Sequence, residues 1–414
     1  MENKKNANFI LITGTLLNFF IGVLYAWGEL KKSLMTRAEN GGWEWSSTQA
    51  GFPYTLAIVC FAIAVVIGGR IQDKIGPRWV LTTGGFMVGL GLILSGLVGN
   101  NPFGVTLCFG VITGFGTGLC YSSVTPPALK WFHPSQKGMV NGFTVGGFGF
   151  APILYAPLVS FLIRFYSSNS ADLTASIEKT FLTLGISIIL ISVTVAQFIK
   201  NPPSGYTPLV PENCKKRIPM PTVDITWRDM IKTKTFMLMS IMFLFSATVG
   251  LMLIGNISKI AQVQVGLQNT AILLSLMAFV NGLGRLCGGI LSDRVGRSKT
   301  LFIVLSIQMI NMLGFLFYNN LPLLVLGVII AGSCYGTFLS VFPSITGDQF
   351  GLKNFGVNYG IMLMFWGLAG VVAPLFADFM FDIHQNFRIT YIACAAIMPV
   401  LIYMNLLLKK EIEK

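Results

Sequence analysis

The chain has 414 residues, of which 53% are hydrophobic and only 11% are charged. Soluble domains carry about 25% charged residues, so this composition excludes an ordinary soluble domain and indicates a polytopic helical membrane protein. The formal net charge of +13 is compatible with nucleic-acid binding, but the positions of the basic residues, described below, favour membrane topology instead. We therefore expect the lipid bilayer, and no nucleic acid, as a partner.

Cysteine and histidine give no sign of a metal centre. None of the seven Cys forms a C-x-x-C pair, and the two His, His133 and His384, are far apart in the sequence. The Cys are typical of small buried apolar residues. No nucleophile–base constellation appears either. We expect no metal, no cofactor other than a coupled proton, and no enzymatic activity.

Apolar stretches recur along the whole chain. A helix needs about 20 predominantly apolar residues to cross a bilayer. This measure predicts twelve spans, at residues 9–30, 48–70, 79–99, 103–125, 138–163, 176–199, 235–257, 269–291, 300–318, 322–345, 356–380 and 389–408. No small-residue cleavage site follows the first stretch, so we expect it to be retained as a span.

The distribution of Lys and Arg predicts the orientation. The N-terminus, the even-numbered loops and the C-terminal tail hold 21 of the 29 Lys and Arg residues, and the odd-numbered loops hold seven. Basic residues gather on the cytoplasmic side, so both termini are expected there. The short tails and the absence of a targeting extension favour the plasma (cell inner) membrane.

The longest hydrophilic stretch, residues 200–234, is rich in proline and carries seven basic residues. We expect it to link an N-terminal six-helix bundle, residues 1–199, to a C-terminal bundle, residues 235–414. Its charges are compatible with a lipid or partner site, although a solvated loop that sets the orientation is preferred. Residues 227–234 are predicted to form a short interfacial helix, because Trp and basic residues favour that zone.

The two halves repeat. Residues 69–78 resemble residues 289–297, with Asp73 and Asp293 at corresponding positions 220 residues apart. Asn141 and Asn358 occupy similar glycine-containing segments that open spans five and eleven. Two six-helix bundles related by a pseudo-two-fold axis are typical of secondary transporters, whose substrate site lies near the midplane. The predicted fold class is therefore all-α integral membrane.

Span eight contains the one permanent cation predicted to lie deep in an apolar span. Asn281 and Arg285 are four residues apart, so they share one face of a helix. A charge inside the membrane is costly and marks a functional site by default. We interpret Arg285 as an anion-binding group. The alternatives are an arginine that snorkels to the interface or pairs with a structural carboxylate.

The loops at residues 69–78 and 289–297 resemble the signature of the major facilitator superfamily. Finer motifs resemble the monocarboxylate (lactate and pyruvate) transporters and the oxalate–formate antiporters. These motifs are Gly22-Val-Leu-Tyr25-Ala-Trp27, Pro202-Pro-x-Gly-Tyr206, Asn281-x3-Arg285 and Asn358-Tyr359-Gly360. The resemblance implies the major facilitator fold and transport by alternating access between the two bundles.

The resemblance also implies roles for single residues. Arg285 corresponds to the arginine that binds the substrate carboxylate, and Asn281, one turn earlier, is expected to orient the guanidinium or donate to the anion. Asn281 stands where the animal carriers have an aspartate implicated in proton coupling. Glu29 is therefore the candidate that takes up the proton or pairs with Arg285 when the site is empty. The alternative is that Glu29 lies in water at the outer interface, because Lys31 and Lys32 follow it.

Aromatic and apolar residues complete the predicted cavity. By the resemblance, Tyr121 and its repeat counterpart Tyr335 donate a hydroxyl to the anion, although bonding between helices is the alternative. Four residues are candidates to line the cavity, although packing between helices is the alternative: Phe148, Leu339, Phe365 and Trp366.

Span eleven bears on the choice of substrate. By the same resemblance, oxalate carriers place a second cation where this chain has Trp366. One arginine neutralises one carboxylate, and a second buried anionic group without a partner is penalised. A small monocarboxylate such as lactate, pyruvate or formate is therefore preferred to oxalate.

The repeated loops are expected to gate the cavity by pairing charges across the bundles and capping helix ends. The gating candidates are Asp73, Lys74, Arg78, Asp293, Arg294 and Arg297. The predicted function is proton-coupled symport of a small organic anion by a monomer. The alternatives are a carboxylate exchanger and an anion receptor that does not transport.

Overall fold

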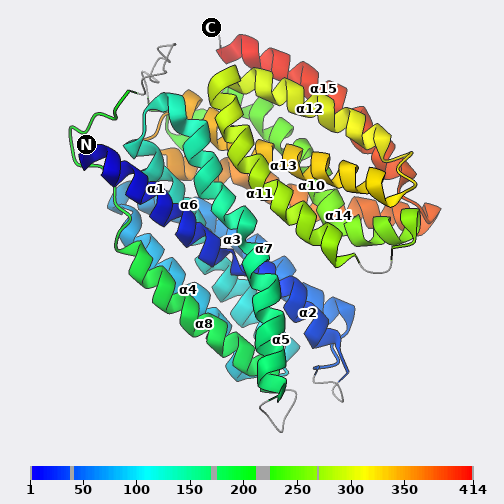
Figure 1. The fold of residues 1–414 in the computed structure, drawn as a ribbon. Helices are drawn as coiled ribbons and strands as arrows, with labels where there is room; N and C mark the ends of the chain where they lie inside the picture. Colours follow the sequence, from blue (N-terminus) through cyan, green and yellow to red (C-terminus); the bar gives the residue numbers. More distant parts are fainter. Residues whose placement is uncertain (1, 38–41, 169–174, 211–223, 268–269, 413–414) are drawn as a thin grey trace. The chain divides into compact units, whose positions relative to one another are not determined.

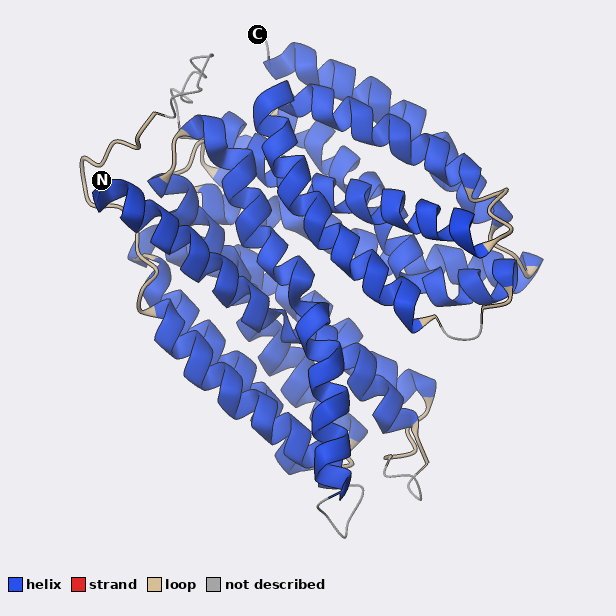
Figure 2. Ribbon diagram, viewed as in Figure 1, coloured by secondary structure: helices blue, strands red, loops and turns tan. Residues whose placement is uncertain are grey.

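The computed structural model describes residues 2–37, 42–168, 175–210, 224–267 and 270–412. These residues form helices joined by short loops, and none of them forms a strand (Figure 2). The helices are α1 (Glu2–Ile21), η1 (Gly22–Ala26), α2 (Trp27–Met35), α3 (Ser47–Ile75), α4 (Pro77–Val98), α5 (Pro102–Val105), η3 (Thr106–Thr113), α6 (Gly114–Trp131), η4 (Pro134–Gln136), α7 (Lys137–Ser168), α8 (Ala175–Ala196), α9 (Trp227–Met230), α10 (Lys234–Val265), α11 (Ala271–Val295), α12 (Arg297–Gly314), α13 (Leu321–Phe350), α14 (Phe355–His384) and α15 (Arg388–Ile412).

Eleven helical segments of the described chain are long and apolar enough to cross a membrane. The predicted span at residues 300–318 corresponds to α12, which is not among the eleven and begins with the polar sequence Arg297-Ser-Lys299. The first span is α1, η1 and α2 in continuous succession. The aromatic motif at residues 22–27 coincides with the tighter 3₁₀ turn η1 and the first residue of α2.

The chain divides into two compact units. Residues 1–131 and 150–208 form the first unit, and residues 132–149 and 209–414 form the second. The first part of α7 thus belongs to the same unit as the C-terminal helices. The sequence-based boundaries had placed all of α7 in the N-terminal bundle, residues 1–199. The observed grouping places the start of α7 in the same unit as Arg285.

Small residues bring the helices of each unit close together. In the first unit α4 and α8 lie side by side (Figure 1), and a Cβ atom at Gly89 would come within 2.4 Å of the carbonyl oxygen of Gly185. In the second unit α11 packs on α13 in the same way, because a Cβ at Gly336 would lie 2.1 Å from the carbonyl oxygen of Asn281. Such contacts are typical of membrane helices that associate through small residues.

The two repeated loops form the same kind of turn. Gly76 separates α3 from α4 with φ of +88°, and Gly296 separates α11 from α12 with φ of +102°. Only glycine adopts such conformations readily, because it has no Cβ atom. The glycines at corresponding positions of the two repeats therefore serve to reverse the chain between successive spans.

Candidate functional site

Arg285 lies in the second unit, and its charge is buried. Its side chain is on α11, and the residue is only 2% exposed. Nε donates to Oδ1 of Asn281 at 3.2 Å, and Nη1 donates to the carbonyl oxygen of Val145 at 2.8 Å. Both acceptors are neutral, and no carboxylate of the described residues forms an ion pair with Arg285. A buried cation in this state has a strong tendency to bind an anion.

Glycines on α7 make room for the guanidinium. A Cβ atom at Gly149 would lie 3.0 Å from Nε and 3.1 Å from Cζ of Arg285. A Cβ at Gly142 would lie 2.6 Å from the carbonyl oxygen of the same arginine. A Cβ at Gly142 would clash with this backbone oxygen, and a Cβ at Gly149 would crowd the guanidinium. These glycines let α7 approach α11 closely enough for the Val145 carbonyl to reach the arginine. Val145 and Gly149 were not among the site residues predicted from the sequence. The signal was the glycine spacing at positions 138, 142, 146 and 149.

Tyr335 and Trp366 form a second polar pair in the same unit. The indole N–H of Trp366, on α14, donates to the hydroxyl of Tyr335, on α13, at 2.7 Å. The Tyr335 ring lies against α10, where a Cβ at Gly250 would meet it. Within the described chain, no hydrogen bond joins this pair to Arg285. Tyr335, a predicted substrate-binding residue, therefore contacts Trp366, a candidate cavity-lining residue.

The candidate cavity walls occupy different surroundings. Phe148 and Leu339 are buried in the second unit, at 6% and 2% exposure. Phe365 is half-buried, and its ring packs edge-on against Phe236 at a centroid distance of 6.0 Å. It lines a groove at the start of α10. The predicted cavity role of all three residues stays a prediction.

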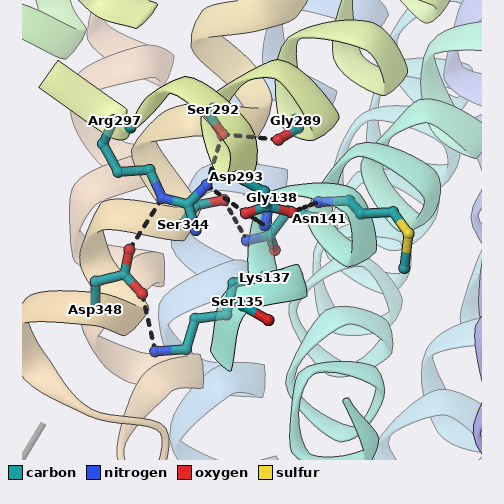
Figure 3. A network of polar contacts seen from close by, with 12 residues as sticks. Ser135, Lys137, Gly138, Asn141, Gly289, Ser292, Asp293, Arg297, Ser344 and Asp348 are labelled. Atoms are coloured by element: carbon teal, nitrogen blue, oxygen red, sulfur yellow. Dashed lines mark hydrogen bonds and ion pairs between the residues drawn. The ribbon is translucent and has the colours of Figure 1, made fainter. Parts of the chain in front are cut away.

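The repeated loop of the second unit carries a network of charges (Figure 3). Asp293, at the end of α11, accepts hydrogen bonds from the backbone N–H groups of Gly138 and Met139, at 2.8 and 2.7 Å. It thereby caps the first turn of α7, where a carboxylate is favoured by the helix dipole. Arg297 donates to Asp293 at 2.6 Å and to Asp348 at 3.0 Å.

Lys137 completes this network. Its side chain is 2% exposed, and Nζ lies 3.0 Å from Asp348 and donates to the carbonyl oxygen of Gly347 at 2.9 Å. Two carboxylates therefore balance Lys137 and Arg297 while Asp293 also holds the start of α7. Asp293 and Arg297 were predicted from the sequence as gating residues, whereas Lys137 and Asp348 were not. A lone charge beside an apolar span was the available signal for both. Arg294, another gating candidate, is exposed.

The remaining candidates lie in the first unit. Tyr121 is buried and packs against Phe61 at a ring distance of 5.3 Å. Glu29 is partly exposed, forms an ion pair with Lys32 at 2.5 Å and accepts a 3.4 Å hydrogen bond from Ser160. These contacts agree with the alternative that Glu29 lies near water beside the lysines.

The loop candidates of the first unit complete the set. Asp73 accepts a 3.3 Å hydrogen bond from Gln72. Arg78 donates to the carbonyl oxygen of Gln197 at 2.8 Å, and Lys74 is exposed.

The repeated helices and the buried arginine are typical of a secondary transporter. Comparisons with known proteins support this class. The oxalate:formate antiporter of Oxalobacter formigenes is 29% identical over 376 residues, which cover 90% of this chain and 83% of that protein. Monocarboxylate transporter 12 of Xenopus laevis is 23% identical over 338 residues, covering 79% and 73%. The crystal structure of the Escherichia coli fucose:proton symporter FucP has a TM-score of 0.71 at 14% identity, covering 96% and 99%.

The family comparison gives the assignment. The Major Facilitator Superfamily profile matches residues 7–321 and 253–414. The chain therefore belongs to the Major Facilitator Superfamily and is a multi-pass membrane transporter rather than an enzyme. The resemblance drawn from the sequence motifs is confirmed, as is the all-helical fold class.

Proposed function

We propose that the protein carries small monocarboxylates, of the lactate, pyruvate or formate type, and that Arg285 binds the carboxylate. The observation behind this proposal is the buried charge of Arg285, whose hydrogen bonds within the described residues go to the neutral oxygens of Asn281 and Val145. A planar guanidinium matches a carboxylate through two parallel hydrogen bonds. Relatives named as a monocarboxylate transporter and an oxalate:formate antiporter support the same substrate class.

One carboxylate is preferred to two because of the surroundings of α14. Trp366 stands where a second cation is expected in an oxalate carrier, and its indole N–H is already bonded to Tyr335. A neutral indole does not compensate a second carboxylate. Burying that second charge without a partner would cost several kcal/mol.

Proton coupling is the preferred mode, because symport of a monovalent anion with one proton leaves the cycle electroneutral. Glu29 is the candidate proton carrier, and Asn281 does not titrate. Exchange of one carboxylate for another is the second candidate, favoured by the relative named as an antiporter.

The Asp293–Arg297 network is proposed as a gate, since it ties α7 to α11 and α13. The protein is proposed to lie in the plasma membrane, with both termini in the cytoplasm.

The decisive experiment is uptake of labelled L-lactate into vesicles that contain the purified protein, with and without an inward proton gradient. Gradient-driven accumulation is expected in the unmodified protein and a loss of at least about 100-fold in Arg285→Ala, because a buried charge-assisted pair is removed. Arg285→Lys should also fail substantially, since lysine cannot form the two parallel bonds. Arg388→Lys, at an exposed arginine at the start of α15 in the same unit, is the matched control and should transport normally.

The outcomes separate the candidates. Uptake only into vesicles preloaded with a second carboxylate would replace symport by exchange. Glu29→Gln should flatten the dependence of uptake on external pH, and an unchanged pH profile would remove Glu29 from proton coupling. Saturable lactate uptake in Arg285→Ala would contradict the assignment of this residue as the anion-binding group.

A further inference from the structure

A groove opens on the second unit at the start of α10. It has a volume of about 360 Å³ and is lined by residues 231–234, the first two turns of α10 and one residue of α14. Its walls are largely apolar, with Phe236, Met237, Ile241 and Phe365 along their length. Met237 is 53% exposed, although it lies in a helix long and apolar enough to span the membrane.

Cations stand at the mouth of this groove. Lys232 and Lys234 line it, and their side chains are 76% and 68% exposed. Each has an acidic neighbour: Asp229 lies 3.9 Å from Lys232, and Glu411 lies 3.6 Å from Lys234. Both partners of the Lys232 pair are exposed, whereas in the Lys234 pair only the lysine is exposed and Glu411 is at 22%. Ion pairs of such length with an exposed lysine contribute little, so both lysines stay available to a stronger anion.

The surroundings of the groove are typical of a membrane interface. Trp227 opens α9, and the guanidinium of Arg228 lies over its ring at 5.4 Å. The Lys234–Glu411 contact brings the last turn of α15 to this corner, and that turn also carries Lys409 and Lys410. Trp and basic residues together mark the level of the lipid headgroups.

We propose that this groove binds an anionic phospholipid. The phosphate lies between Lys232 and Lys234, and one acyl chain lies along Met237, Ile241 and Phe365. Basic pockets between membrane helices are suited to anionic headgroups, and the exposed apolar wall is suited to a hydrocarbon chain rather than to water. A soluble phosphate would use the lysines but not the wall. The site lies apart from Arg285 and is independent of the transported substrate.

The test uses the full-length protein purified in detergent and titrated with dioctanoyl phosphatidylglycerol. The thermal midpoint is followed, because a ligand that binds only the folded state raises it. A saturable rise is expected with this lipid and not with dioctanoyl phosphatidylcholine. In the double variant Lys232→Gln, Lys234→Gln the apparent Kd should weaken roughly 25-fold, since each lysine near an anionic headgroup contributes about fivefold.

Matched variants distinguish the groove from general surface charge. Lys299→Gln with Lys353→Gln removes two exposed lysines of the same unit outside the groove and should leave the apparent Kd unchanged. Met237→Gln should weaken binding while keeping both charges. Met364→Gln, a methionine of α14 that is 46% exposed and does not line the groove, should not.

Three results would overturn the proposal. The first is equal binding by the groove variants and their controls. The second is a thermal shift with glycerol 3-phosphate equal to that with phosphatidylglycerol, which would indicate a site for a soluble anion. The third is a concentration-dependent dimer that is lost in the lysine double variant while the lipid has no effect, which would assign the groove to a second copy of the chain.

Discussion

The starts of α7 and α14 are built from similar sequences but are held by different contacts. Each contains an asparagine between glycines, Asn141 and Asn358, and both asparagines are completely buried. Asn141 donates to the hydroxyl of Ser344 at 2.9 Å, whereas Asn358 donates to the carbonyl oxygen of Ile225 at 3.0 Å. One asparagine holds a neighbouring helix, and the other holds the chain that leads into α9.

Charge holds the start of α7. Asp293 caps its first backbone N–H groups, and Lys137, in its first turn, pairs with Asp348. The side chains of Asp293, Asp348 and Lys137 are 10%, 20% and 2% exposed. Such contacts are strong in low dielectric but depend on every partner being present, because an unpaired buried charge is costly.

Hydrogen bonds with the chain that leads into α9 hold the start of α14. Asn354 also donates to the Ile225 carbonyl, at 3.3 Å, and the backbone N–H of Ile225 donates to the carbonyl oxygen of Phe350 at 3.1 Å. The carboxylate of Asp224 accepts a hydrogen bond from the backbone of Lys353 at 3.1 Å. The comparison shows that a sequence repeat preserves the helix and its glycines, while neighbours outside the repeat decide what the asparagine binds.

Among variants at the two helix starts, Asp293→Asn is expected to change the free energy of unfolding most. The substitution keeps the shape but removes the negative charge that Arg297 and the α7 backbone share. Breaking a buried pair by removing one partner costs about 3–5 kcal/mol. We expect a loss of this order in the free energy of unfolding, measured by titration with sodium dodecyl sulfate in mixed micelles.

A double-mutant cycle checks that the loss comes from the pair. Asp293→Asn combined with Arg297→Gln should cost less than the sum of the two single changes, because the double variant leaves no buried charge unpaired at that point. Additive costs would mean that Asp293 acts only through the α7 backbone.

An intermediate effect is expected at the two asparagines. Asn141→Ala and Asn358→Ala should each reduce the free energy of unfolding by about 1 kcal/mol, the net value of one neutral hydrogen bond. The partners stay hydrogen-bonded, since Ser344 also donates to Ser340 and the Ile225 carbonyl also accepts from Asn354.

Hydrogen exchange separates the two asparagines. Asn358→Ala should speed amide exchange at Ile225, and Asn141→Ala should leave it unchanged. Equal protection of Ile225 in both variants would contradict the difference drawn between the two helix starts.

The smallest effect is expected at the exposed cations of the repeated loops. Lys74→Gln and Arg294→Gln remove side chains that lie on the surface, so neither should change the free energy of unfolding measurably. Arg297→Gln in the same titration is the contrasting variant, since that guanidinium is 12% exposed and bonded to two carboxylates. A large loss of unfolding free energy in Arg294→Gln would show that the charge of a loop residue, rather than its burial, decides how much that residue stabilises the protein.

The sequence by itself determined the membrane class, eleven of the helical spans and the shared helix face of Asn281 and Arg285. Long apolar stretches must become helices in a bilayer, because no water is present to satisfy the backbone. The spacing of Asn281 and Arg285 placed them on one helical face, and the structure confirms their hydrogen bond. The same helical spacing joins Asp293 to Arg297.

Only the tertiary structure decided which distant residues complete these pairs. Val145 lies 140 residues from Arg285, and Asp348 lies 51 residues from Arg297. Neither distance is encoded in the periodicity of a single helix. They follow from close helix packing, which at Gly142 depends on the absence of a Cβ atom, because one there would lie 2.6 Å from the carbonyl oxygen of Arg285. Local spacing therefore gave each charged residue its neighbour on the helix, and the packing of helices gave it the rest of its surroundings.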